Sequence, residues 1–215
     1  MDASTKDPRP VVEVRDVAPD ELEALIGVVA RGMRDNPFNI AVFGNDPERR
    51  QRRMTKTFRT WFDVFTEQVP LVAIDDSGSI VGGTGVAPPG SCQATVGQQL
   101  RSLPSGASLG PRVIVRAGRA LRGWGKRDIA EPHWHLGPFA VDAHLQGRGI
   151  GTQVLLEHTR RLDDIGAVGY LETDKDVNVR LYERHGYQVI DEGPVLSVHC
   201  WFMRRPASSG TEQPR

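Results

Sequence analysis

The sequence has 215 residues, 39% of them hydrophobic and 25% charged, which is typical of a soluble globular protein with one domain or two very small ones. Its 27 basic and 27 acidic side chains balance, so charge does not indicate binding to nucleic acid or to an anionic membrane. No apolar run approaches the ~20 residues that cross a bilayer, and the first ten residues lack the apolar segment of a secretory signal, so we expect a cytoplasmic protein.

The only two cysteines are Cys92 and Cys200, and neither has neighbours at metal-ligand spacing. A single pair of cysteines does not define a disulfide framework. We therefore expect two free thiols, no metal site and no covalent enzyme intermediate.

The predicted elements begin after a polar tail at residues 1–10, which we expect to be disordered. Alternation of apolar and polar residues over Val11–Val17 predicts a strand. Apolar residues at helical spacing then predict a helix from about residue 20 to Met33, which the sequence Asp35-Asn36-Pro37 interrupts.

A second helix is expected over Pro47–Glu67, with aromatic residues on one face. Such a stripe is more often core than a ligand site. Two apolar runs around a turn, Leu71–Ile74 and Ser79–Val86, predict a hairpin. The four arginines of the helix, Arg49, Arg50, Arg52 and Arg53, are expected to face solvent.

Residues 90–131 break this pattern, with short helices expected near 94–102 and 111–123. This segment is either a cover over the substrate or an ordinary packed insertion. The final part of the chain predicts an α/β domain in which helices cross a mixed sheet. Its strands are expected at His133–Val141, Val168–Thr173, Tyr187–Asp191 and Val195–Arg204, the last two separated by Glu192-Gly193-Pro194, and its helices at Gly149–Asp164 and Val177–His185.

The loop Gln146–Gly151 lies between a predicted strand end and a helix start. Three glycines let a ligand approach the backbone, and the N–H groups of the first helical turn favour an anion such as a pyrophosphate. Thr152 occupies the third glycine position of the dinucleotide-binding fingerprint, so that fingerprint fails, and the phosphate-loop motif is absent too. A flexible loop that merely permits a tight turn is the alternative.

Three motifs in order resemble the GNAT superfamily of acyl-CoA-dependent N-acyltransferases. Gln146, Gly149 and Gly151 match the family signature [Gln/Arg]-x-x-Gly-x-[Gly/Ala]. The preceding strand, Leu136–Asp142, is similar to the family's strand leading into the cofactor loop. Downstream, Leu171–Thr173 is followed by residues that resemble the family's Asn-x-x-x-Tyr and Gly-aromatic patterns, namely Asn178, Tyr182, Gly186 and Tyr187.

The resemblance implies an α/β fold with a mixed, splayed central sheet of about seven strands, flanked by about four helices, with a helical insertion before the fourth strand. It implies a single GNAT-like domain over residues 11–205, with residues 90–131 on the substrate side and a second disordered tail at 206–215. It also implies direct transfer of an acetyl group from acetyl-CoA, the co-substrate, to a primary amine in a ternary complex. Two rival functions are a non-catalytic acyl-CoA-binding or sensing module and a protein lysine or N-terminal acetyltransferase.

The segments His133–Leu136, Leu171–Thr173 and Tyr182–Arg184 further resemble the puromycin N-acetyltransferase-like branch, which favours a small-molecule amine as substrate. We expect a monomer or homodimer that binds neither nucleic acid nor membrane. The resemblance implies that the strand binds the pantetheine arm through main-chain atoms and that the loop binds the pyrophosphate. The expected cofactor-binding residues are Phe139, Ala140, Val141, Gln146, Gly147, Arg148, Gly149, Ile150, Gly151, Thr152 and Asn178.

Three residues are candidates for proton transfer. The resemblance implies that Tyr182 protonates the departing thiolate of CoA. His135 is a candidate general base, because serotonin N-acetyltransferase, a family member, uses a His-x-His pair on the equivalent strand. Glu172 is the second candidate base. Strict alternation would place His133, His135, Gly137, Phe139 and Val141 on one face of their strand.

Overall fold

A computed structural model of the chain describes residues 10–208, so residues 1–9 and 209–215 of the two predicted tails lie outside the described part. Within it, seven strands form one mixed sheet in the order β1-β2-β3-β4-β5-β7-β6. The predicted α/β class, the seven strands and the helical insertion before the fourth strand are confirmed. The strands are β1 (Glu13–Asp16), β2 (Leu71–Ile74), β3 (Ile80–Ala87), β4 (Trp134–Val141), β5 (Gly169–Thr173), β6 (Gln188–Val195) and β7 (Val198–Arg205).

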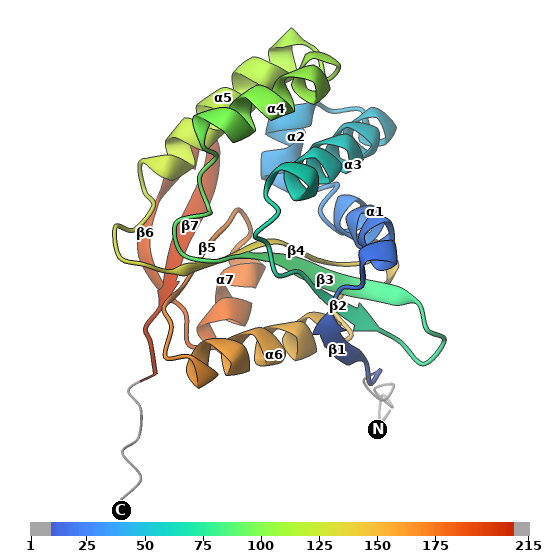
Figure 1. The fold of residues 1–215 in the computed structure, drawn as a ribbon, viewed down its shortest axis with the longest axis vertical. Coiled ribbons are helices and arrows are strands. Elements are labelled where there is room, and N and C mark those ends of the chain that lie inside the picture. Colours follow the sequence, from blue (N-terminus) through green and yellow to red (C-terminus); the bar gives the residue numbers. More distant parts are fainter. Residues whose placement is uncertain (1–9, 209–215) are drawn as a thin grey trace, which may run out of the picture.

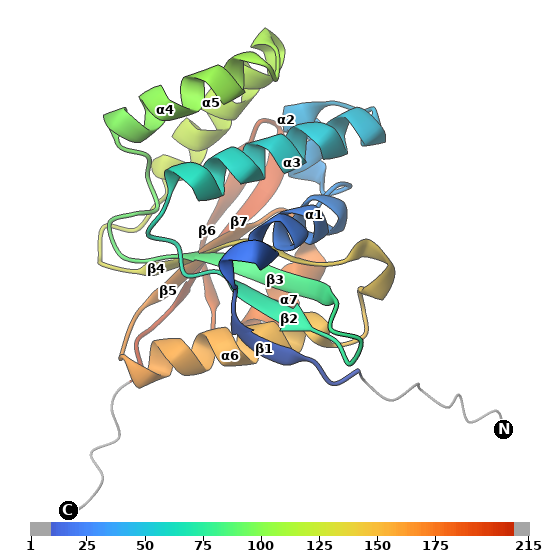
Figure 2. The same cartoon turned by 45° about the vertical axis from the view of Figure 1, so that its right-hand side comes forward.

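Helices cover both faces of this sheet (Figures 1 and 2). Helices α1 to α5 lie on one side, where α4 and α5 form an antiparallel pair outside α2 and α3, and α6 and α7 lie on the other. None of the helices in the described part is long and apolar enough to cross a membrane. Their bounds are α1 (Leu22–Gly32), α2 (Pro37–Phe43), α3 (Pro47–Val64), α4 (Val96–Ala107), α5 (Pro111–Gly125), α6 (Ile150–Asp164) and α7 (Asp176–Glu183).

The centre of the sheet opens between its fourth and fifth strands. These two strands are parallel and pair only where they begin, at Trp134 with Gly169 and at His135 with Tyr170. All the other neighbouring strands are antiparallel over the described residues. Beyond the two pairs, β4 turns toward the loop that precedes α6 while β5 turns toward α7. In the described part of the chain, the edge of β4 that faces β5 therefore has no strand partner from residue 136 onward.

The chain differs from the sequence-based expectations in two connections. The chain leaves α1 before Pro37, as expected. Pro37 then begins α2, a short helix that periodicity did not predict. Proline is tolerated at the first helical position because the N–H that it lacks would have no partner within the helix. Strand β6 continues through Gly193-Pro194, and the hairpin turns instead at Leu196 and Ser197, both with positive φ. The predicted separator Glu192–Pro194 is therefore wrong.

The predicted solvent exposure of the arginine cluster on α3 is wrong for Arg50. Its side chain is 3% exposed and donates to the carbonyl oxygens of Arg34 and Gly44 and to the carboxylate of Asp35. Buried guanidinium groups persist where all their donors find acceptors. Arg50 therefore ties the beginning of α3 to the turns on either side of α2, whereas Arg52 lies exposed on the same helix.

Candidate functional site

The glycine loop forms an open cradle at the beginning of α6. Gly147 and Gly149 adopt φ angles of 80° and 89°, which side chains disfavour, and Gly149 is the N-cap of the helix. The first helical bond runs from Gln153 N to Gly149 O, so the N–H groups of residues 150–152 point out of the helix end. A Cβ at Gly151 would lie 3.2 Å from the Phe139 ring. Backbone donors, the helix dipole and the absence of side chains together suit an anion.

Two polar contacts hold this cradle in place. The Gln146 amide donates to the carbonyl oxygens of Gly32 (2.9 Å) and Val141 (3.1 Å), which joins the loop to the end of α1 and the end of β4. The Arg31 guanidinium lies 2.6 Å from the buried Asp142 carboxylate just before the loop. Burial alone would raise the pKa of Asp142, but the Arg31 contact outweighs it and lowers that pKa. Gln146 therefore holds the loop against α1 and β4. The exposed Arg148 is the only positively charged residue of the loop 146–151.

The odd-numbered residues from His133 to Val141 do not all lie on one face of the sheet, so the strict alternation predicted for this strand is wrong. The pairs Thr84–Phe139 and Val86–Leu136 are two positions apart on β3 but three positions apart on β4, which defines a bulge at Gly137-Pro138. Leu136 and Phe139 consequently both pack on the α6–α7 side of the sheet. Before the bulge the even-numbered residues face the α6–α7 side, and after it the odd-numbered residues do.

His135 and Glu172 form a contact at the point where the sheet opens. His135 Nε2 lies 2.7 Å from Glu172 Oε2, and both side chains are largely enclosed. The Tyr170 ring lies against the His135 ring and packs in the core on the α2–α5 side. Burial alone would lower the pKa of His135, but the Glu172 carboxylate and the Cys92 thiol outweigh it and raise that pKa. The structure thus brings the two candidate bases together as one pair.

Tyr182 lies on the opposite side of the sheet from that pair. It is 5% exposed and packs with Leu136 and Leu171 of the two splayed strands. Burial, with Asp174 and Glu172 nearby, raises the pKa of its phenol, which keeps the group protonated. One turn earlier on α7, the Asn178 amide donates to Thr173 Oγ1 at 3.3 Å, which ties the helix to the end of β5.

A second polar cluster lies beside His135 and was not predicted. Cys92, in the segment after β3, has its Sγ 3.6 Å from His133 Nε2, and Asp128, in the segment after α5, has Oδ1 3.2 Å from that nitrogen. The neighbouring imidazoles of His133 and His135, with His133 the larger influence, lower the pKa of Cys92 to about 7. The contact of His133 with Asp128 outweighs burial and raises the pKa of His133. Cys92 and His133 are 41 positions apart in the sequence, so no local spacing motif could have indicated this cluster.

The comparisons with known proteins agree with this geometry. The Acetyltransferase (GNAT) family matches residues 38–187, which contain the loop, the splayed strands and Tyr182. A Corynebacterium glutamicum protein described as histone acetyltransferase HPA2 and related acetyltransferase has 17% identity and a TM-score of 0.68 over 93% of this chain and 98% of that one.

Two further solved structures share the fold. A phosphinothricin acetyltransferase from Sinorhizobium meliloti, in complex with acetyl-CoA, has 14% identity and a TM-score of 0.57 over 94% of this chain and 92% of that one. The Drosophila melanogaster polyamine N-acetyltransferase, which catalyses formation of N-acetylagmatine, has 17% identity and a TM-score of 0.59 over 91% of this chain and the whole of that one.

Proposed function

The chain belongs to the GNAT family and is an acetyl-CoA-dependent N-acetyltransferase, and from this premise we propose that it acetylates a primary amine of a small molecule. One observation carries the proposal. The His135–Glu172 pair and the Tyr182 phenol lie on opposite sides of the same opening in the sheet. A proton acceptor and a proton donor on the two sides suit an amine that approaches from one side and a thiolate that leaves on the other.

The residues of the cradle fit the co-substrate. Residues 147–152 offer outward N–H groups for the pyrophosphate, and the free edge of β4 beside Phe139, Ala140 and Val141 offers backbone groups for the pantetheine arm. Gln146 would hold the cradle in position through its hydrogen bonds to two carbonyl oxygens. Arg148 would add a charged contact on the loop, and Asn178, on α7, would add a polar contact to the cofactor. Acetyl-CoA supplies an acetyl thioester whose carbonyl carbon accepts the amine.

Each catalytic side chain then has one task. The Glu172 carboxylate takes a proton from the substrate ammonium, while His135 donates to it through Nε2 and fixes its orientation. The Tyr182 hydroxyl gives a proton to the departing sulfur, and its burial keeps that proton in place beforehand. The two reactants would meet where β4 and β5 separate, so proximity would supply much of the rate.

The preference for a small amine over a protein rests on sequence resemblance and on the relatives. Segments His133–Leu136 and Tyr182–Arg184 resemble the puromycin N-acetyltransferase-like branch. The Sinorhizobium and Drosophila relatives are named for acetylation of small amines. The α4–α5 insertion lies on the same side of the sheet as α1 to α3 (Figure 2), which is the side of the His135–Glu172 pair and the side from which we propose that the amine enters. It is therefore the segment we propose as the cover over the substrate.

A CoA-release assay with acetyl-CoA and a panel of amines tests the proposal. The panel contains puromycin, polyamines, agmatine, arylalkylamines and lysine-containing peptides, with mass spectrometry of the products. We expect release with at least one small amine and no acetylated peptide. Acetylated peptides alone would assign the chain to protein acetylation, and tight acetyl-CoA binding with no release for any amine would indicate a non-catalytic binding module.

A further inference from the structure

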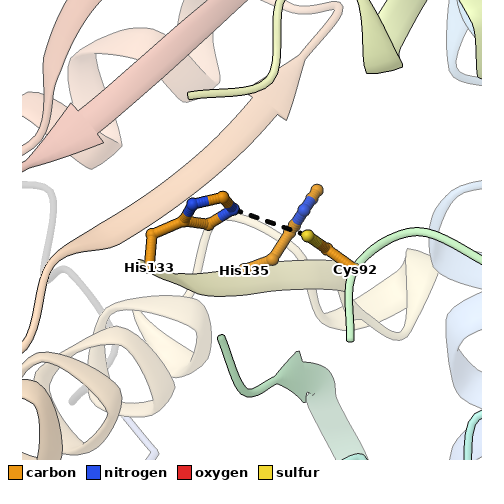
Figure 3. A group of neighbouring side chains, drawn as sticks. All are labelled: Cys92, His133 and His135. Atoms are coloured by element: carbon orange, nitrogen blue, oxygen red, sulfur yellow. Dashed lines mark hydrogen bonds between the residues drawn. The ribbon is translucent and has the colours of Figure 1, made fainter. Parts of the chain in front are cut away.

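The cluster of Cys92, His133 and His135 has the composition of a metal site. Figure 3 shows Cys92 entering from the segment after β3 and meeting the two histidines at the beginning of β4. The sulfur and one nitrogen from each ring all lie within 4.8 Å of one another. Thiolate and imidazole are the ligands that Zn²⁺ prefers in proteins.

His133 is oriented as a metal-binding imidazole is. Its Nδ1 lies 2.9 Å from the carbonyl oxygen of Glu131, which can only accept, so Nδ1 carries the proton. In the neutral ring that metal binding requires, Nε2 then presents its lone pair to the interior of the cluster, where the Cys92 sulfur lies 3.6 Å away. Ligating histidines usually donate their second N–H to a carbonyl or a carboxylate in this way.

His135 also has one ring nitrogen on a hydrogen-bond acceptor and the other without one, but here Nε2 contacts the acceptor and Nδ1 is left. Its Nε2 is 2.7 Å from the Glu172 carboxylate. Its Nδ1 is buried and has no hydrogen-bond partner among residues 10–208. Buried polar atoms are rarely left without a partner in folded proteins. A bound cation would give this lone pair the partner that it lacks.

Asp128 adds a fourth group with an unused lone pair. Its Oδ1 is buried and lacks a hydrogen bond within the described part of the chain, although it lies 3.2 Å from His133 Nε2. Its Oδ2 accepts from Gln93 and lies 3.6 Å from the Cys92 sulfur. The cluster of Cys92, His133 and His135 and its neighbour Asp128 thus contain two buried atoms, His135 Nδ1 and Asp128 Oδ1, that lack a hydrogen bond.

We propose that this cluster binds one Zn²⁺ through Cys92 Sγ, His133 Nε2 and His135 Nδ1, with the Asp128 carboxylate in the fourth position. In a tetrahedral site, a Zn–S bond of about 2.3 Å and a Zn–N bond of about 2.0–2.1 Å separate sulfur and nitrogen by about 3.6 Å. The observed separation between Cys92 and His133 has that value.

The proposed ion would have a structural consequence for the acetyltransferase site. It would fasten the segments on both sides of the α4–α5 pair to the beginning of β4, where the sheet opens. It would bind His135 through Nδ1 and leave its Nε2 contact with Glu172 intact. The ion would thus restrict the movement of His135 and, through it, of Glu172, and it would not occupy the space between β4 and β5.

Metal binding to the full chain tests the proposal. The protein is freed of metal with a chelator, its zinc affinity is measured by competition with a chromophoric chelator, and its zinc content is measured after dialysis. We expect one Zn²⁺ per chain for wild type and for Cys200→Ser, a control at the other cysteine. We expect an affinity at least about 100-fold lower for Cys92→Ser and for His133→Gln, beyond the range typical of losses from outer-shell changes.

Co²⁺ supplies a readout that a merely structural role for Cys92 would not affect. Wild type and Cys200→Ser should develop a thiolate-to-cobalt charge-transfer band, and Cys92→Ser should not. Circular dichroism establishes that each variant is folded. No stoichiometric zinc in wild type, or equal affinities for wild type and Cys92→Ser, would overturn the proposal. Acetyl-CoA binding and CoA release are measured separately, so zinc binding without acetyl transfer would refute the proposed function alone.

Discussion

His158, on the buried face of α6, is predicted to make the stability of the protein depend on pH. The side chain is 2% exposed, and its Nε2 lies 3.0 Å from the hydroxyl of Tyr187. Burial, with Arg205 and Arg161 nearby, lowers the pKa of His158 from 6.5 to about 4. This contact joins the helix that forms the cradle to the Gly186-Tyr187 motif behind the sheet.

The sign of the effect follows from proton binding. Between pH 4 and pH 6.5 the unfolded chain protonates His158 while the folded chain does not, so the unfolded state binds more protons and stability rises with pH. The contribution is fully present above pH 6.5 and is lost as the pH falls toward 4. With these two pKa values, the free energy of unfolding should fall by about 2 kcal/mol between pH 7 and pH 5 from this group alone.

Urea unfolding of wild type and His158→Gln at pH 7 and pH 5 measures that contribution. Glutamine can still hydrogen-bond the Tyr187 hydroxyl but does not titrate, so the difference between the two proteins isolates the imidazole. Wild type should lose about 2 kcal/mol more than the variant between the two pH values. Equal losses would refute the assignment of a neutral, buried imidazole at this position.

Three further predictions concern the site and its support. Tyr182→Phe should lower kcat by about 10²- to 10⁴-fold with acetyl-CoA affinity unchanged, as single-turnover kinetics and calorimetry would show, and unchanged turnover would exclude the acid role. Glu172→Gln should lower kcat/KM for the amine within the same range, and the rate should stay low at saturating amine because kcat falls too. A rate that recovers fully at saturating amine would indicate a binding role only. Arg50→Ala should cost about 2–4 kcal/mol of unfolding free energy because three hydrogen bonds lose their donor, whereas the exposed Arg52→Ala should cost under about 0.5 kcal/mol; equal costs in chemical denaturation would contradict the buried role of Arg50.

Much of the fold could be predicted because the apolar patterns of the chain match its secondary structure. Helix α6 and strands β4 and β5 begin and end within a residue or two of the predicted bounds. The turn at Leu196-Ser197 could not be predicted, since neither residue is typical of positive φ, whereas Gly193-Pro194 is typical of a turn and instead lies within β6. Arg50 was predicted wrongly because an arginine in a cluster is usually solvated, and only tertiary packing supplied its acceptors.

The candidate site divides in the same way. The loop Gln146–Gly151 is contiguous, so its glycines and helix start could be recognised directly. The pair of His135 and Glu172 depends on how the parallel strands β4 and β5 align, which no single segment encodes. Cys92 meets the histidines because it follows the end of β3, where Ala87 pairs with His135 across the sheet, and that pairing is not visible in any single segment. The bulge at Gly137-Pro138 likewise changes which face the later residues occupy, and alternation alone does not include it.

Binding of acetyl-CoA to the cradle is the measurement that tests the proposed site most directly. Isothermal titration of wild type and of Gly149→Ala is suitable, because Gly149 holds a φ of 89° at the N-cap of α6, where a Cβ strains the loop without removing a charge. We expect one acetyl-CoA per wild-type chain, and at least about tenfold weaker binding to the variant, equivalent to about 1.4 kcal/mol, with the variant still folded. Equal affinity in the two proteins, or no binding to wild type, would contradict the assignment of the pyrophosphate to this loop.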